Sequence, residues 1–113
     1  MASFQTTIHK KCTMQQFVSY IEKNVIDSSM SASLEESTDM VDGDSKCCVR
    51  VFERYSYTGG NRLSLNVTCF QCGDGPIRVF AAATGGSQAL LFKMNTWGEE
   101  SFLSIFEEIV VSF

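Results

Sequence analysis

The chain has 113 residues, of which 44% are hydrophobic and 19% are charged. This composition excludes a wholly disordered, fibrous or coiled-coil protein, and the length predicts a single domain over residues 1–113. Thirteen acidic residues against nine basic ones give a formal net charge of −4, so the chain lacks the surplus of Lys and Arg that nucleic-acid binding requires. The first twelve residues form no secretory signal, and no apolar run reaches eighteen residues. We therefore expect a cytoplasmic protein without membrane contact.

The first two predicted elements are a strand and a helix. Residues 4–9 alternate apolar and polar side chains, which is typical of a strand. Thr13 and Gln16 have the spacing of a capping box, so a helix begins there and runs to about residue 26. Its apolar residues recur at helical spacing and form one stripe that would be buried.

The next stretch, residues 27–45, contains six acidic residues and six serines but no basic residue. Such a composition is typical of a mobile segment. We interpret it as an acidic linker, either a solubilising loop or a cover that docks on a basic face of the domain.

The second half of the chain is predicted to form strands and one more helix. Segments rich in Val, Phe, Tyr and Thr predict strands at 46–57, 62–71, 77–84 and 87–94. A second capping box, Thr96 with Glu99, begins the final helix. The order β-α-β-β-β-β-α predicts an α+β two-layer sandwich, with an antiparallel sheet of four to five strands and both helices on one face.

Two pairs of segments resemble a known family. The first pair is Val-Phe-Glu-Arg-Tyr at 51–55 with Leu-Ser-Leu at 63–65, and the second is Ala-Thr-Gly-Gly at 83–86 with Trp-Gly-Glu-Glu-Ser-Phe at 97–102. They resemble a small bacterial family, the domain-of-unknown-function family 6054, over most of the chain outside the acidic segment. The resemblance implies a bacterial single-domain protein and designates no catalytic residue.

Strand alternation predicts the two faces of the sheet. If residues 59–61 form a three-residue loop, Val51 pairs with Cys69 and Tyr55 with Leu65, which places the apolar positions under the helices. The opposite, outer face then carries cations beside aromatic residues: Arg50, Phe52, Arg54, Phe70, Arg78, Phe80, Leu91 and Lys93. Aromatic residues and Arg are enriched in interface cores, so this face predicts a homodimer or another protein partner. The alternative on the same face is a small anionic ligand held by the arginines.

A second alternative is a pocket between the sheet and the helices, lined by Glu53, Tyr55, Tyr57 and Trp97, that binds a small anionic or apolar ligand. Only Glu53 and His9 are candidates for a catalytic acid or base, and His9 with Cys12 lacks an identifiable Asn or Asp to orient the histidine. We therefore expect a non-enzymatic domain that uses no cofactor.

The five cysteines are an odd number, which fits a reducing compartment. In the predicted register Cys47 and Cys69 point inward as buried thiols, whereas Cys48 and Cys72 point outward and face each other. Four sulfur atoms split between two faces do not converge on a metal, so we predict no metal site. A disulfide between Cys48 and Cys72 under oxidising conditions stays open.

Overall fold

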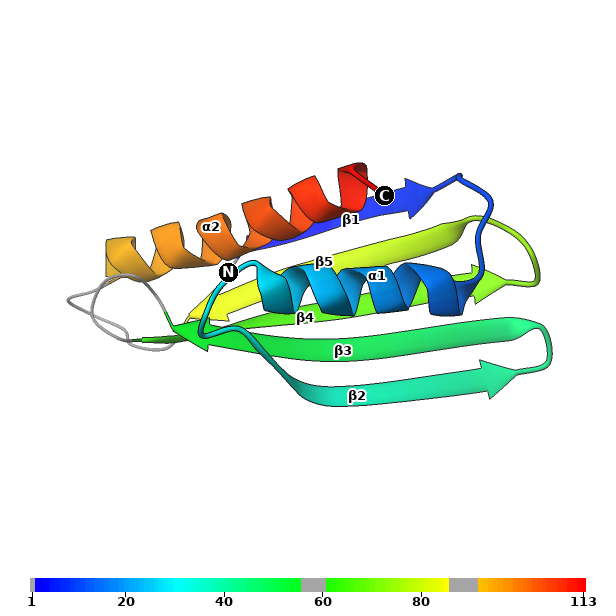
Figure 1. Cartoon of the computed structure of the whole chain (residues 1–113), viewed down its shortest axis with the longest axis horizontal. Coiled ribbons are helices and arrows are strands. Elements are labelled where there is room, and N and C mark those ends of the chain that lie inside the picture. The colour runs from blue at the N-terminus through cyan, green and yellow to red at the C-terminus, as the bar shows by residue number, and fades with distance from the viewer. Residues whose placement is uncertain (1, 56–60, 86–91) are drawn as a thin grey trace.

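A computed structural model of the protein describes residues 2–55, 61–85 and 92–113, with the side chains of the last range described from residue 102 onward. The elements are β1 (Ala2–Ile8), α1 (Met14–Asp27), β2 (Ser33–Asp42), β3 (Ser45–Tyr55), β4 (Arg62–Cys72), β5 (Ile77–Gly85) and α2 (Phe92–Val111). The strands form one antiparallel sheet in the order β1-β5-β4-β3-β2, and both helices cover the same face (Figure 1). The predicted fold class and element order are confirmed.

Two predicted elements differ in the structure. The expected acidic linker contains β2, which pairs with β3 from Ser33 opposite Glu53 to Asp42 opposite Ser45. Composition misled here because an edge strand keeps most side chains in water, so acidic residues do not oppose strand formation. The strand expected at 87–94 is also wrong at its end, since residues 92–94 belong to α2, while residues 87–91 lie outside the described ranges. Thr96 therefore lies within α2 and is not its N-cap.

The start of α1 follows from the capping box. Thr13 Oγ1 accepts a hydrogen bond from the Gln16 backbone N–H at 3.1 Å, and Gln16 Oε1 accepts one from the Thr13 N–H at 2.9 Å. Both bonds satisfy donors that a helix N-terminus otherwise leaves unpaired. The predicted apolar stripe of α1 is buried against the sheet, and Tyr20 Oη donates to the Ile109 carbonyl of α2 at 2.6 Å. This bond joins the two helices.

The register of β3 on β4 differs from the prediction by three residues. Phe52, instead of Tyr55, lies opposite Leu65. The described pairing ends with Tyr55 opposite Arg62, whereas a three-residue loop at 59–61 would have placed Thr58 opposite Arg62. An odd shift exchanges the faces of a strand, so the even-numbered residues of β3 point toward the helices. The predicted inward residues of β4 and β5 are buried as expected.

The core lies between the sheet and the two helices. Four phenylalanines with no exposed surface form its centre: Phe17, Phe52, Phe102 and Phe106. The helix α2 packs on β1, β5 and β4, whereas α1 packs on β4, β3 and β2. Within the described ranges, neither helix combines the length and apolar character needed to cross a membrane. Within the described ranges, this packing leaves the outer face of the sheet and part of β2 without a helix over them (Figure 1).

Candidate functional site

The structure separates the residues that were predicted to share the outer face. Three of them, all on β3, point toward the helices: Arg50, Phe52 and Arg54. Three others lie on the outer face as predicted: Phe70, Arg78 and Phe80. Leu91 lies outside the described residues, and Lys93 is in α2 with a side chain that is also outside them. The predicted combined Arg/Phe face is therefore wrong, because the three-residue shift moved the β3 side chains to the other side of the sheet.

Arg54 illustrates the consequence of this shift. Its side chain is 2% exposed, and its guanidinium lies over the Phe102 ring of α2 with 4.5 Å between the guanidinium carbon and the ring centroid. A cation over an aromatic face is stabilised by the ring quadrupole. Arg54 is a core residue and is not accessible to a ligand on the outer face.

The outer face carries an apolar patch in place of the predicted one. We call it the outer patch, and it consists of Met40, Cys47, Val49, Val51, Phe70 and Phe80. Phe70 lies opposite Arg78, and Phe80 lies opposite Thr68, so the two phenylalanines are diagonal neighbours on β4 and β5. They remain 39% and 45% exposed. Neither helix covers this patch in the described part of the chain.

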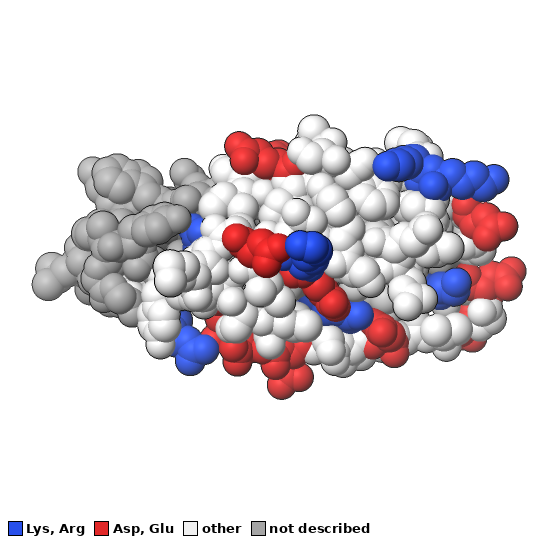
Figure 2. Space-filling view, viewed as in Figure 1, with Lys and Arg blue, Asp and Glu red and all other residues white. Residues whose placement is uncertain are grey.

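Charged residues frame the outer patch on two sides. Glu36 and Asp42 lie on the outer face of β2, opposite Val51 and Ser45 of β3. Figure 2 shows, from the helix-covered side, that acidic side chains gather along the edge where β2 lies. On the other side of the patch, Arg78 of β5 is exposed. The outer face therefore has an acidic margin at β2 and a basic residue near β1.

The predicted pocket between the sheet and the helices is wrong for the two of its residues that the structure describes. Glu53 lies on the outer face, where it forms an ion pair with Arg62 and accepts a hydrogen bond from Ser64 Oγ at 3.4 Å. Tyr55 is also on that face and is 53% exposed. Tyr57 and the side chain of Trp97 lie outside the described residues. The shifted register again explains the difference.

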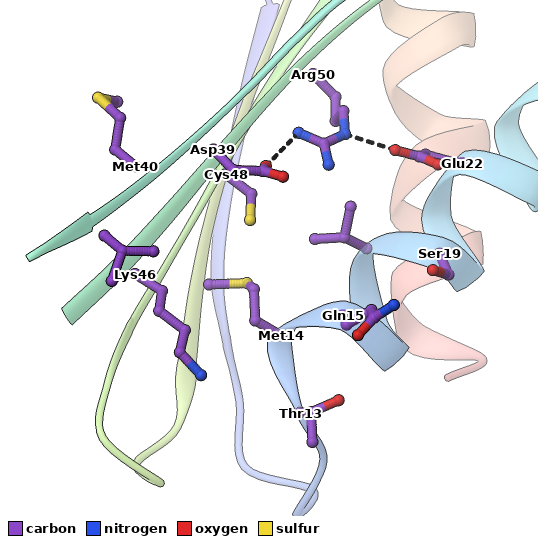
Figure 3. A pocket seen from close by; sticks show the side chains of 12 residues that line it. Thr13, Met14, Gln15, Ser19, Glu22, Asp39, Met40, Lys46, Cys48 and Arg50 are labelled. Carbon is purple, nitrogen blue, oxygen red and sulfur yellow. Dashed lines mark hydrogen bonds and ion pairs between the residues drawn. The ribbon is translucent and has the colours of Figure 1, made fainter. Parts of the chain in front are cut away.

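A different pocket, a groove of about 540 Å³, runs between α1 and the helix-facing side of β2 and β3 (Figure 3). Met14, Val18 and Glu22 of α1 form one wall, and the strands contribute Val41, Lys46, Cys48 and Arg50. The groove is open because α1 lies over the middle of the sheet, whereas β2 extends beyond it (Figure 1). Its volume falls within the range of roughly 300–1,000 Å³ typical of small-molecule sites.

Arg50 lies at one end of this groove with a side chain that is only 11% exposed. Its Nε donates to Glu22 Oε2 at 2.5 Å, and its Nη1 donates to Asp39 Oδ1 at 2.7 Å. Nη1 also donates to the backbone carbonyls of Val49 and Thr38, at 3.0 and 3.3 Å. Nη2 forms no hydrogen bond with any described residue and points into the groove (Figure 3).

The charges around Arg50 shift its pKa and that of Asp39. Burial disfavours the charged guanidinium, but the hydrogen bonds with Asp39 and Glu22 outweigh burial and raise the pKa of Arg50. The same hydrogen bond from Arg50, together with one from Cys48, lowers the pKa of Asp39. Arg50 and Asp39 therefore both stay charged at neutral pH.

Sequence reasoning missed this cluster because it placed Arg50 on the other face and Asp39 in a linker. The signal that could have found Glu22 is its spacing, since it follows Val18 by four residues and so shares that side of α1. The position of Asp39 depends on β2, which composition did not reveal.

The cysteines also differ from the prediction. Cys48 lies directly opposite Cys69 on the helix-facing side, whereas Cys47 and Cys72 are on the outer face. Burial raises the pKa of Cys69 to about 12, and burial together with a hydrogen bond to Asp39 raises that of Cys48 to about 11. Cys48 and Cys72 are on opposite faces, so the open prediction of a disulfide between them is wrong. In the described ranges, no three His, Cys, Asp or Glu side chains gather as metal ligands.

These features define the protein as an α+β sandwich with one helix-covered sheet face, one open sheet face and a polar groove at the margin of the helix layer. The comparison with family models places it more narrowly. The chain belongs to the family described as "Family of unknown function (DUF6054)", whose model matches residues 1–113. The family that the sequence segments indicated is thereby confirmed. No curated protein and no solved structure matches the chain.

Proposed function

We propose that this protein is a non-catalytic domain that forms a homodimer through its outer sheet face. The observation that carries the proposal is the exposure of Phe70 and Phe80, at 39% and 45%, on neighbouring inner strands of a face that neither helix covers in the described part of the chain. Apolar area of this kind is stabilised when a partner removes it from water. Aromatic residues at the centre of a patch are also the usual anchors of protein interfaces.

The size of the face suits a second copy of the chain. Five strands at a spacing of roughly 4.8 Å, each with about nine residues rising roughly 3.3 Å, give a face of about 20 by 30 Å. Its flat area is about 600 Å². The side chains that project from the face and those at its margins increase the accessible area toward the roughly 800 Å² per partner of a standard interface. Face-to-face packing of two sheets is also an established arrangement in proteins.

The charges on the face favour one orientation of the two copies. With the two-fold axis parallel to the strands and above β4, β2 of one copy lies over β1 of the other. That orientation brings Asp42 of one copy toward Arg78 of the second copy. An axis perpendicular to the strands would instead place β2 over β2, so that Glu36 of one copy would face Asp42 of the other and the two acidic margins would repel each other. Complementary charge therefore supports the parallel axis.

The proposal is tested by substitutions within the outer patch. We expect Phe80→Glu and Phe70→Glu to convert a dimer of twice 12.6 kDa into a monomer, as measured by light scattering after size exclusion. The matched control is Met30→Glu, which also places a charge at an exposed apolar residue, here one in the loop after α1. The control should remain dimeric. If Phe80→Glu keeps the wild-type mass and is folded by circular dichroism, the outer patch is not the interface.

A charge exchange tests the orientation separately. Arg78→Asp should weaken the dimer because it would face the acidic margin of the second copy, and adding Asp42→Arg should restore the dimer by re-forming an opposite-charge pair. Failure of the double substitution to restore affinity, with Phe80→Glu still monomeric, would refute the parallel axis.

The protonation of the Cys48 thiol supports the proposal that the domain is non-catalytic. Cys48 is beside Asp39, but its pKa of about 11 keeps the thiolate scarce at neutral pH, and the thiolate is the nucleophilic form. A screen that finds turnover dependent on Cys48, lost in Cys48→Ala, would contradict this part.

A further inference from the structure

We infer that the groove beside α1 binds a small apolar carboxylate that carries an uncharged oxygen, such as a hydroxyl, at its other end. The inference does not rest on the homodimer, because the groove is on the helix-facing side of β2 and β3 and the outer patch is on the opposite side. It depends on three parts of the groove, which are the Arg50 end, the apolar side chains between the two ends and the Lys46 end.

The Arg50 end presents hydrogen-bond donors that the described residues do not use. Nη2 of Arg50 carries two N–H groups and points into the groove, while Nε and Nη1 are held by Glu22 and Asp39 (Figure 3). A guanidinium fixed in this way loses little further freedom when a ligand binds. Because two carboxylates already balance its charge, a third carboxylate here would be repelled. The group that suits Nη2 is therefore an uncharged oxygen acceptor.

Between its two ends the groove is lined by apolar side chains together with the polar Gln15 and Ser19 of α1. Met14 and Val18 of α1 line it with exposed fractions of 3% and 5%, and Cys48 lines it from β3 with 8%. Across from them, Val41 of β2 lies on the same side of the sheet but is 69% exposed. An apolar ligand body would contact all four and would remove Val41 from water.

The Lys46 end supplies a positive charge that no acidic side chain neutralises within the described residues. Lys46 is exposed and lies on the same side of β3 as Arg50, four residues before it. In a strand this separation is roughly 13 Å, and the hydrogen bonds at the two ends of a ligand add to its own length, so a chain of about eight carbons spans the groove. The ligand carboxylate belongs at Lys46, and the uncharged oxygen at Arg50.

The experiment measures binding of 8-hydroxyoctanoate and octanoate to the full chain by isothermal titration calorimetry. We expect saturable binding of both, with 8-hydroxyoctanoate several-fold tighter because only its hydroxyl reaches Arg50. Lys46→Gln should weaken both about tenfold, since it removes a charge-assisted contact. Lys23→Gln is the matched control, because Lys23 is an exposed lysine of α1 outside the groove, and it should leave both affinities unchanged.

A second variant blocks the site without touching its charges. Val41→Trp fills the groove from an exposed position, so it should fold normally and abolish binding of both probes. The inference is overturned if neither probe binds saturably to the wild type, or if Val41→Trp binds as tightly as the wild type. It is equally overturned if Phe80→Glu abolishes binding, because the probe would then occupy the outer patch. Each result is independent of the dimer mass, so the two proposals can fail separately.

Discussion

Removing the Arg50 side chain should destabilise the fold in a way that an ordinary surface ion pair does not. Arg50→Met keeps the apolar stem but leaves the Glu22 and Asp39 carboxylates without their shared partner. The guanidinium is 11% exposed, whereas the Glu22 and Asp39 side chains are 31% and 60% exposed. A hydrogen bond to a charged group contributes about 1.5–3 kcal/mol when it is buried. Because both carboxylates can return to water, we expect a total loss of about 2 kcal/mol.

Urea unfolding of Arg50→Met measures this loss as a change in the free energy of unfolding. The control is Lys23→Met, which breaks the exposed pair of Lys23 with Asp27 on α1 and should give no measurable change. A cycle with Asp39→Asn then isolates the coupling between Arg50 and Asp39. If Arg50→Met is as stable as the Lys23→Met control, the ion-pair cluster does not hold α1 to β2 and β3, and the reasoning about the groove wall is refuted.

The pH dependence of stability provides a further check on the same pair. The pKa of Asp39 in the folded protein lies below its ordinary value of 3.8 because Arg50 and Cys48 donate hydrogen bonds to it. Stability from this carboxylate is therefore fully present above pH 3.8 and is lost as the pH falls through the lower, folded pKa. Arg50→Met should lose less stability than the wild type over that acidic range. Equal losses in the two proteins would contradict the assignment.

Three shorter predictions concern other parts of the fold. Cys72, which is exposed, should be alkylated by iodoacetamide well before Cys69, which is 2% exposed with a pKa of about 12, and mass spectrometry showing the reverse order would contradict the strand faces. Tyr20→Phe removes the hydrogen bond to the Ile109 carbonyl and should cost about 1 kcal/mol in urea unfolding, whereas no change would mean that this bond does not join the helices. Gly73→Ala should cost about 1–2 kcal/mol, because Gly73 has a φ of +55° and nothing within 4 Å of an added Cβ, and a neutral result would contradict that backbone conformation.

The sequence correctly predicted the elements in which the pattern of apolar residues allows only one side to be buried. In α1, the capping box and a single apolar stripe agree, so both the start and the buried side were predicted correctly. In β4, Leu63 and Leu65 flank Ser64, and in β5, Ile77 and Val79 flank Arg78. A period of two then determines which side is buried.

The face of β3 could not be predicted in this way because both of its sides carry apolar residues. Val49 and Val51 alternate with Arg50, Phe52 and Arg54. Burying two arginines under the helices has a high free-energy cost unless partners offset it, and the local sequence indicates no such partner. Tertiary contacts make this burial possible, because α1 supplies Glu22 to Arg50 and α2 supplies the Phe102 ring to Arg54. The loop length that would have decided the register lies in residues 56–61, where Gly and Asn fit more than one turn.

The groove was beyond prediction for a related reason. It requires β2 to be a strand and α1 to leave part of that strand uncovered, and neither follows from the local pattern of an acidic segment. The outer patch was found in part, because Phe70 and Phe80 lie on β4 and β5, whose faces were correct. Its β2 and β3 members followed only once the register was known.

The most direct test of the central claim is the molar mass of the unmodified protein across a concentration series, measured by sedimentation equilibrium. If the outer patch closes a two-fold interface, the mass rises with concentration from 12.6 kDa toward twice that value and stops there, because an isologous contact uses the same face on both copies. A mass that stays at 12.6 kDa throughout, or one that continues to rise beyond the dimer, would contradict the claim.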